Sequence, residues 1–212
     1  ADLFSFEGME GLDLAKDVST RQTYKWNETP WAWGAGYDHE AKPTWKAVVI
    51  DYGVKRNILR LLAGMGADIT VVPADATTAD VMRHQPDGVL LSNGPGDPAA
   101  TGEYAVPEIR ALIDSGTPVF GICLGHQMLA LAVGARTVKM EQGHHGANHP
   151  VKDVTTGKVE IVSMNHGFTV DRASLPEPVT ETHISLFDGT NAGMALKGRP
   201  VFSVQHHPEA SP

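Results

Sequence analysis

The chain has 212 residues, 42% of them hydrophobic, and a formal net charge of −8. This length suits one packed domain, or one domain with an appendage, and is short for two full domains. The acidic balance and the lack of a lysine- or arginine-rich run exclude nonspecific binding to nucleic acid or to a membrane surface as the expected role. No apolar stretch is long enough to span a bilayer, and the first residues do not have the pattern of a signal peptide. We therefore expect a soluble protein that binds small molecules or other proteins.

Residues 1–45 differ in composition and in hydrophobic pattern from the rest of the chain. They contain Trp26, Trp31 and Trp33 among glycines and charges, with little hydrophobic periodicity. We interpret them as an interdomain linker or arm, and residues 46–212 as the main domain. The aromatic side chains could cover apolar surface of this domain or of an absent one, or could form the core of a small subdomain.

From Lys46 onward, apolar strand patterns alternate with helical ones. Strands are predicted at residues 47–50, 68–72, 88–91 and 117–122, and helices around 58–65, from Thr77 or Thr78 to Arg83, at 104–113 and around 128–132. This alternation is typical of an α/β three-layer sandwich, in which helices cover both faces of a mostly parallel sheet. Later strands at 137–140, 159–164, 183–187, 193–196 and 201–204 are expected to extend the sheet, partly in antiparallel fashion. Ligands of such sheets bind at the carboxyl ends of the parallel strands.

The only cysteine, Cys123, lies at one of these strand ends, within the segment GICLGHQ at 121–127. A lone cysteine in an apolar stretch is usually a small buried hydrophobe. However, the glycines two residues before and after it are typical of the strained strand-to-helix turn that presents a nucleophile. The amides at the start of the following helix would favour a thiolate. A single, reactive cysteine also favours the reducing cytoplasm over an oxidising compartment.

Two further segments could complete a cysteine-dependent site. The loop at 92–98 follows a predicted strand, and an amide of its glycines, with that of Leu124, could stabilise an oxyanion, although an ordinary turn is the alternative. Near the C-terminal end, His206 or His207 could act as the base, and Glu209 could orient the imidazole. Spacing alone does not choose between the two histidines.

A third segment is rich in histidine. His144, His145 and His149 precede the segment NHGF at 165–168. Clustered histidines can indicate zinc, but the spacing fits no zinc pattern and no second cysteine exists, so we predict no metal site. Loop hydrogen bonding is the expected role of these residues, and Asn165, Gly167 and Phe168 offer surfaces suited to a small amino-acid ligand.

Together these segments resemble the class I glutamine amidotransferases, and among them the small subunits of carbamoyl-phosphate synthetases. The motifs that carry the resemblance are DYGVKRNI (51–58), LSNGPGDP (91–98), GICLGHQ (121–127), GHHGANHP (143–150), NHGF (165–168), SLFDGT (185–190) and HPEASP (207–212). The resemblance implies a flavodoxin-like fold for residues 46–212.

The resemblance also implies residue roles and partners. Cys123 would attack the side-chain amide of L-glutamine, His207 would transfer the proton, and Glu209 would orient His207. Glutamine would be bound by Gly94, Gly96, Leu124, Gln127, Asn165, Gly167 and Phe168, with the amides of Gly94 and Leu124 as oxyanion donors. The released ammonia would pass to a synthetase large subunit, which would make carbamoyl phosphate from bicarbonate and ATP for arginine and pyrimidine biosynthesis. No cofactor is expected on this chain, since ATP and magnesium would bind the large subunit.

The chain departs from the family pattern in two respects. Small subunits of this family carry an additional N-terminal domain, and family members commonly have glycine where this chain has His206. A ring at that position could crowd the base or compete for its proton. The alternatives that stay open are another Cys-His-Glu hydrolase, such as a γ-glutamyl hydrolase or the amidotransferase of a different synthase, and a noncatalytic assembly module.

Overall fold

A computed structural model describes residues 8–37 and 42–210 of the chain. Its strands are β1 (Tyr24–Trp26), β2 (Trp45–Asp51), β3 (Ala67–Pro73), β4 (Gly88–Leu91), β5 (Val119–Ile122), β6 (Thr137–Asp153), β7 (Val159–Val170), β8 (Val179–Ser185), β9 (Asn191–Leu196) and β10 (Val201–Val204). Its helices are α1 (Ala15–Val18), α2 (Arg56–Gly64), α3 (Thr78–Met82), α4 (Pro98–Asp114) and α5 (Leu124–Ala132), with a short 3-10 helix at Arg172–Ser174.

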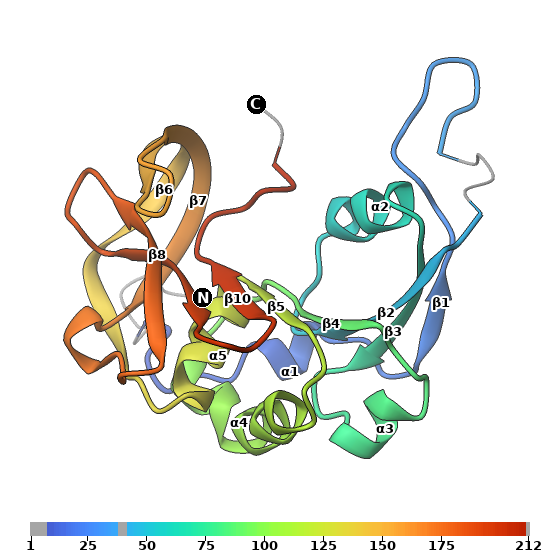
Figure 1. Cartoon of the computed structure of the whole chain (residues 1–212), viewed down its shortest axis with the longest axis horizontal. Coiled ribbons are helices and arrows are strands. Elements are labelled where there is room, and N and C mark those ends of the chain that lie inside the picture. The colour runs from blue at the N-terminus through green and yellow to red at the C-terminus, as the bar shows by residue number, and fades with distance from the viewer. Residues whose placement is uncertain (1–7, 38–41, 211–212) are drawn as a thin grey trace, which may run out of the picture.

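The strands form one open, mixed sheet in the order β1-β3-β2-β4-β5-β10-β9-β8-β6-β7 (Figure 1). The run from β3 to β10 is parallel throughout, and β1 and the strands beyond β10 pair in antiparallel fashion. The predicted α/β sandwich with a mostly parallel sheet is therefore confirmed. Its parallel centre brings the carboxyl ends of β2, β4, β5 and β10 to one edge.

Helices lie on both faces of the parallel strands. The helix α2 covers one face, and α1, α3, α4 and α5 lie on the other (Figure 1). In β2, Val48 and Ile50 belong to the apolar cluster that includes α4 and α5, whereas Ala47 and Val49 belong to the cluster that includes α2. Burial on both sides explains why these strands read as continuous apolar runs rather than as alternating ones.

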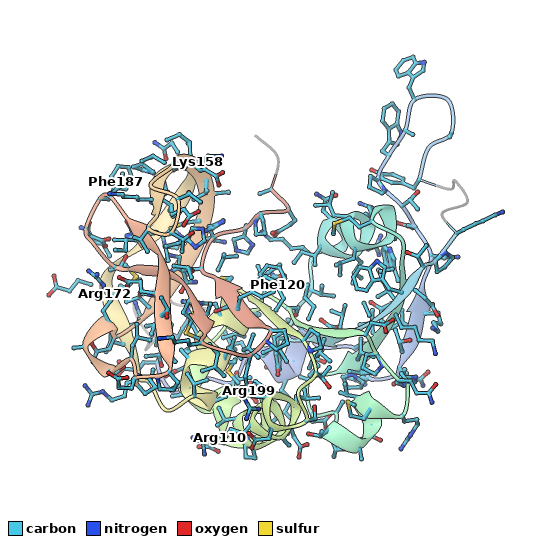
Figure 2. All side chains as sticks on the ribbon, in the orientation of Figure 1. Arg110, Phe120, Lys158, Arg172, Phe187 and Arg199 are labelled. Carbon is cyan, nitrogen blue, oxygen red and sulfur yellow. The ribbon has the colours of Figure 1, made fainter. Side chains whose placement is uncertain are left out.

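The α2 face of the sheet is only partly covered. Phe120 lies on this face (Figure 2). Its ring stacks on that of Phe202 with ring centroids 4.7 Å apart, and Phe202 is about half exposed. An apolar hollow of about 350 Å³ lies beside this pair, between β4, β5, β10 and the end of α2. Within the described part of the chain, no helix covers this portion of the sheet.

Local sequence signals explain where two helices begin. Thr77 caps α3 through a capping box with Asp80, so Thr77 rather than Thr78 is the cap. Asp97 caps α4 and Pro98 occupies its first turn. The helix therefore begins six residues before the predicted start at Tyr104, because its small residues at 99–102 gave no apolar periodicity.

The predicted loops in the histidine-rich region were wrong. The segment 143–149 lies within β6, and 165–168 lies within β7, where His144 pairs with His166 across the ladder. Irregular register between Lys139 and His144, and again between Gly146 and His149, breaks the alternation that would have revealed the strands.

The first 45 residues pack along the main sheet over much of their described length. Residues 24–26 form β1 at the edge of the sheet, and Trp26 packs against the α2-side cluster. The N–H of Gly11 donates to Asp97, and Asp97 in turn donates its N–H to the carbonyl of Leu12. Trp33, by contrast, is 90% exposed on a projecting loop. A division of the chain at residue 45 remains our proposal.

None of the helices in the described segments is long and apolar enough to cross a membrane.

Candidate functional site

Cys123 occupies a strained turn between β5 and α5. Its φ is +54° and its ψ is −101°, a backbone conformation that residues other than glycine rarely adopt. A Cβ atom at Gly121 would lie 2.6 Å from the carbonyl oxygen of Gly125, and one at Gly125 would collide with the carbonyl of Leu91. The turn therefore requires glycine on both sides of the cysteine, as its sequence predicted.

A histidine–carboxylate pair lies beside the cysteine. Nδ1 of His207 is 2.7 Å from Oε1 of Glu209, and both residues are buried. Cys123 and His207 line the same cavity, and the Cys123 thiol donates to the carbonyl of Asn165 at 3.8 Å. The N–H of His207 donates to the carbonyl of Ser163 on β7, which fixes the backbone after β10. The structure thus joins Cys123, His207 and Glu209 into one connected set.

The same geometry sets the charge of the histidine. Burial disfavours the imidazolium, yet the hydrogen bonds with Cys123 and Glu209 outweigh it and raise the pKa of His207 to about 9. Burial likewise disfavours the Glu209 carboxylate, but its hydrogen bond with His207 and the nearby charge of Lys55 lower its pKa. At neutral pH the pair is therefore an imidazolium and a carboxylate.

His206 lies away from this group. It is buried, and its ring packs edge-on against His183 at a centroid distance of 5.7 Å. Burial, with the neighbouring histidines, lowers the pKa of His206 to about 4. The neutral ring of His206 packs toward β8, so it neither crowds the cavity nor competes with His207 for a proton.

The loop after β4 lies against the cysteine turn. The N–H of Gly125 donates to the carbonyl of Ser92 at 3.0 Å, and a Cβ atom at Gly94 would collide with the carbonyl of Tyr52. Neither the Gly94 nor the Leu124 N–H donates to another residue within 8–37 or 42–210. These two amides are therefore available to a ligand oxygen.

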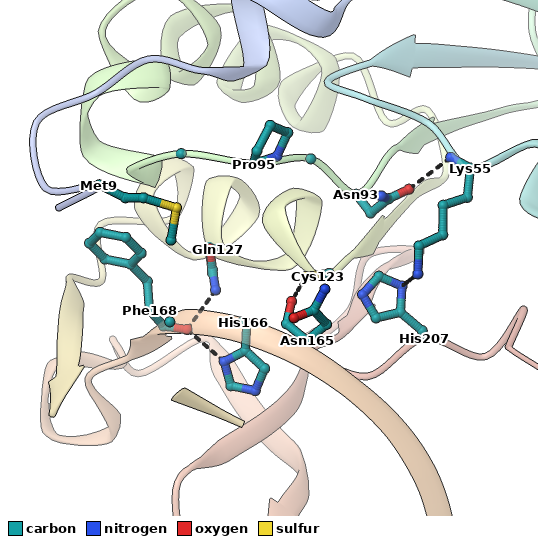
Figure 3. Close-up of a pocket in the computed structure, with 13 residues that line it drawn as sticks. Met9, Lys55, Asn93, Pro95, Cys123, Gln127, Asn165, His166, Phe168 and His207 are labelled. Atoms are coloured by element: carbon teal, nitrogen blue, oxygen red, sulfur yellow. Dashed lines mark hydrogen bonds between the residues drawn. The ribbon is translucent and has the colours of Figure 1, made fainter. Parts of the chain in front are cut away.

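A cavity of about 350 Å³ opens above Cys123 (Figure 3). It is lined by Met9, Lys55, Asn93, Gly94, Pro95, Gly96, Cys123, Gln127, Asn165, His166, Gly167, Phe168 and His207. All the predicted site residues line it except Leu124, whose side chain is buried in the core, and Glu209, which lies behind His207. Such a volume suits a small-molecule ligand.

Sequence reasoning missed five residues that line this cavity, Met9, Lys55, Asn93, Pro95 and His166. Lys55 extends from the start of α2 to within 3.3 Å of Nδ1 of His207, and the side-chain oxygen of Asn93 accepts from the Lys55 N–H (Figure 3). Met9 comes from the first 45 residues, and His166 lies next to Asn165 on β7. The motifs at 51–58, 91–98 and 165–168 contain all of these except Met9. Nothing in the pattern around Met9 indicates its position.

The histidine-rich hairpin forms hydrogen bonds instead of a recognisable metal centre. Nε2 of His144 is 2.8 Å from Asp188, and Nδ1 of His145 is 2.7 Å from the side-chain oxygen of Asn165. Across the described residues, no group of three or more His, Cys, Asp or Glu is placed to hold a metal ion. The contact between His145 and Asn165 lies within the hairpin, whose strand β7 forms part of the cavity wall.

Comparisons with known proteins agree with this fold and site. Residues 48–212 match the model of the family "Glutamine amidotransferase class-I", and the chain belongs to that family. The chain is 74% identical over 208 residues to the carbamoyl phosphate synthase small chain of Caulobacter vibrioides, and 68% identical to that of Mesorhizobium japonicum. These alignments cover 98% of this chain but 54% and 52% of the relatives, so the chain spans about half of their length.

Solved structures show the same fold. A protein from Thermoplasma acidophilum that is described as part of a GMP synthase superposes with a TM-score of 0.68 at 26% identity, over 82% of this chain and 87% of that one. A glutamine amidotransferase from Thermotoga maritima gives a TM-score of 0.63 at 19% identity, over 82% and 78% of the two chains, which supports the fold alone.

Proposed function

We propose that this chain is a glutaminase domain that hydrolyses L-glutamine and supplies the ammonia to the large subunit of a carbamoyl-phosphate synthetase. One observation carries the proposal: a cysteine in a strained turn and a buried histidine that is paired with Glu209 line the same small-molecule cavity. The similarity to carbamoyl phosphate synthase small chains supports the choice of synthase.

The proposed chemistry begins with attack of the Cys123 thiolate, whose proton has passed to His207, on the side-chain amide carbon of glutamine. The amide oxygen becomes an oxyanion, which the N–H groups of Gly94 and Leu124 stabilise. His207 then gives its proton to the departing nitrogen, the carbon–nitrogen bond breaks, and ammonia leaves a glutamyl thioester on the sulfur. Glu209 keeps the imidazole oriented during this transfer.

Hydrolysis of the thioester closes the cycle. His207, now neutral, accepts a proton from water as the water oxygen attacks the thioester carbon. The carbon–sulfur bond breaks, glutamate leaves, and the sulfur and the imidazolium return to their starting states. Gly96, Gln127, Asn165, Gly167 and Phe168 are proposed to hold the amino-acid end of the substrate.

The partner carries the remaining chemistry in this proposal. The large subunit would bind ATP and magnesium, activate bicarbonate and combine it with the ammonia, and this chain would need no cofactor of its own. A cytoplasmic location is consistent with such a pathway enzyme. Arginine and pyrimidine biosynthesis would use the carbamoyl phosphate.

Ammonia release by the wild-type chain and the Cys123→Ser variant, each with and without the large subunit, tests the proposal. We expect glutamine-dependent ammonia release that becomes faster with the large subunit and that Cys123→Ser abolishes while the fold is retained. Hydrolysis that Cys123→Ser leaves undiminished would refute the nucleophile. Hydrolysis that is equally fast without the large subunit, or that prefers γ-glutamyl peptides, would favour a different Cys-His-Glu hydrolase.

A further inference from the structure

Two buried glutamine side chains meet behind the cavity. Gln127 lies in the first turns of α5, and Gln205 directly follows β10. Nε2 of Gln127 donates to Oε1 of Gln205 at 3.0 Å and to the carbonyl of Phe168 at 2.7 Å. Gln205 is fully buried and does not line the cavity, whereas Gln127 does.

These contacts determine which way the Gln127 amide faces. Its two N–H groups are engaged by two acceptors, which leaves the carbonyl oxygen as its remaining hydrogen-bonding group. That oxygen accepts no hydrogen bond from the described segments of the chain. The backbone carbonyl of Phe168 can only accept a hydrogen bond, so it requires the Nε2 side of the Gln127 amide and fixes the observed orientation.

This arrangement leaves one hydrogen-bond donor of Gln205 unpaired within the described part of the chain. Its own Nε2 is buried and has no hydrogen-bond partner among the described residues. A buried unpaired N–H group is destabilising, so a hydrophobic side chain of similar shape would suit the fold better. The backbone N–H of Gln205 donates to Ala192, which fixes the position from which its side-chain oxygen reaches Gln127.

We propose that Gln205 is a positioning residue that holds the carbonyl oxygen of Gln127 as the acceptor for the α-ammonium group of the substrate. This inference rests on the proposed function. When the side-chain amide of glutamine lies at Cys123, its other end carries an ammonium and a carboxylate. A fixed carbonyl oxygen accepts a charge-assisted hydrogen bond from the ammonium and repels the carboxylate. The pair therefore selects a substrate that has a free α-amino group.

The test compares L-glutamine with glutaramate, which has the same amide but no α-amino group. Gln205→Met removes the acceptor and keeps a similar shape, whereas Gln205→Glu keeps an acceptor oxygen. Assays use the full chain with its synthetase large subunit. We expect Gln205→Met to raise KM for glutamine about five- to tenfold, the effect of one hydrogen bond, with kcat and the KM for glutaramate unchanged. Gln205→Glu should retain the wild-type KM.

Other outcomes overturn the inference. Equal rises in KM for both substrates would mean a merely structural role, and an unchanged KM for glutamine would mean no role. If Gln205→Met does not fold, Gln127→Met must lower the preference for glutamine over glutaramate, and a retained preference refutes the inference. Gln22→Met, at an exposed position, is the matched control. A wild-type protein that hydrolyses no glutamine would refute the proposed function itself, a result distinct from these.

Discussion

The N–H of Gly125 donates to the carbonyl oxygen of Ser92 at 3.0 Å, and this bond joins the first turn of α5 to the loop that follows β4. Cys123 precedes that helix, and Gly94 belongs to that loop. The nucleophile and its proposed oxyanion donor are therefore fixed relative to each other by backbone contacts. Precise placement of this kind requires that no side chain separate the two segments.

We expect Gly125→Ala to lose glutamine hydrolysis. The new Cβ would collide with the carbonyl of Leu91, so the loop and the helix must move apart, at a cost of about 1–3 kcal/mol in the free energy of unfolding. Urea unfolding and ammonia release measure the two effects. Gly88→Ala is the control, because its nearest neighbour would be the Pro118 carbonyl at 3.7 Å. Full activity in Gly125→Ala would show that this contact is not needed.

Replacement of Glu209 by glutamine should move the pH dependence of the reaction. Burial disfavours the charged imidazole, and the hydrogen bonds with Cys123 and Glu209 raise the pKa of His207 to about 9. Without the carboxylate this pKa should fall toward the ordinary value of about 6.5, and kcat/KM should drop at least about tenfold because the ring loses its orientation. A pH profile of kcat/KM from pH 6 to 10 measures both. An alkaline limb at the same pH in Glu209→Gln would contradict this role.

Buried histidines should make the fold sensitive to acid. Burial lowers the pKa of His126 to about 3 and those of His166 and His206 to about 4. In the unfolded chain these histidines take up protons below about pH 6.5, so acid favours unfolding. Their contribution to stability is complete above that pH and is lost as the pH falls toward 4.

The variant His206→Gln isolates one of these contributions. Between pH 7 and pH 4.5, the free energy of unfolding should fall by about 2–3 kcal/mol less in the variant than in the wild-type chain. Urea unfolding at the two pH values provides the measurement. Parallel losses in wild type and variant would show that His206 is already protonated in the fold.

The parallel half of this fold was readable from the sequence because its strands are buried on both faces and separated by amphipathic helices. The turn at Cys123 was readable for a related reason, since only glycine fits beside the carbonyls of Gly125 and Leu91. The long hairpin of β6 and β7 was not, because its register shifts and polar residues hide the alternation. Met9 reaches the cavity only through the tertiary fold, and no local pattern indicates such a placement.

The central claim is that the Cys123 sulfur forms a covalent bond with the glutamyl group of the substrate. Mass spectrometry of the protein quenched in acid during turnover of L-glutamine tests it most directly. We predict a glutamyl adduct that peptide mapping places on Cys123 and that hydroxylamine removes. Glutamine turnover with no adduct on Cys123, or with the adduct on another residue, would contradict the account.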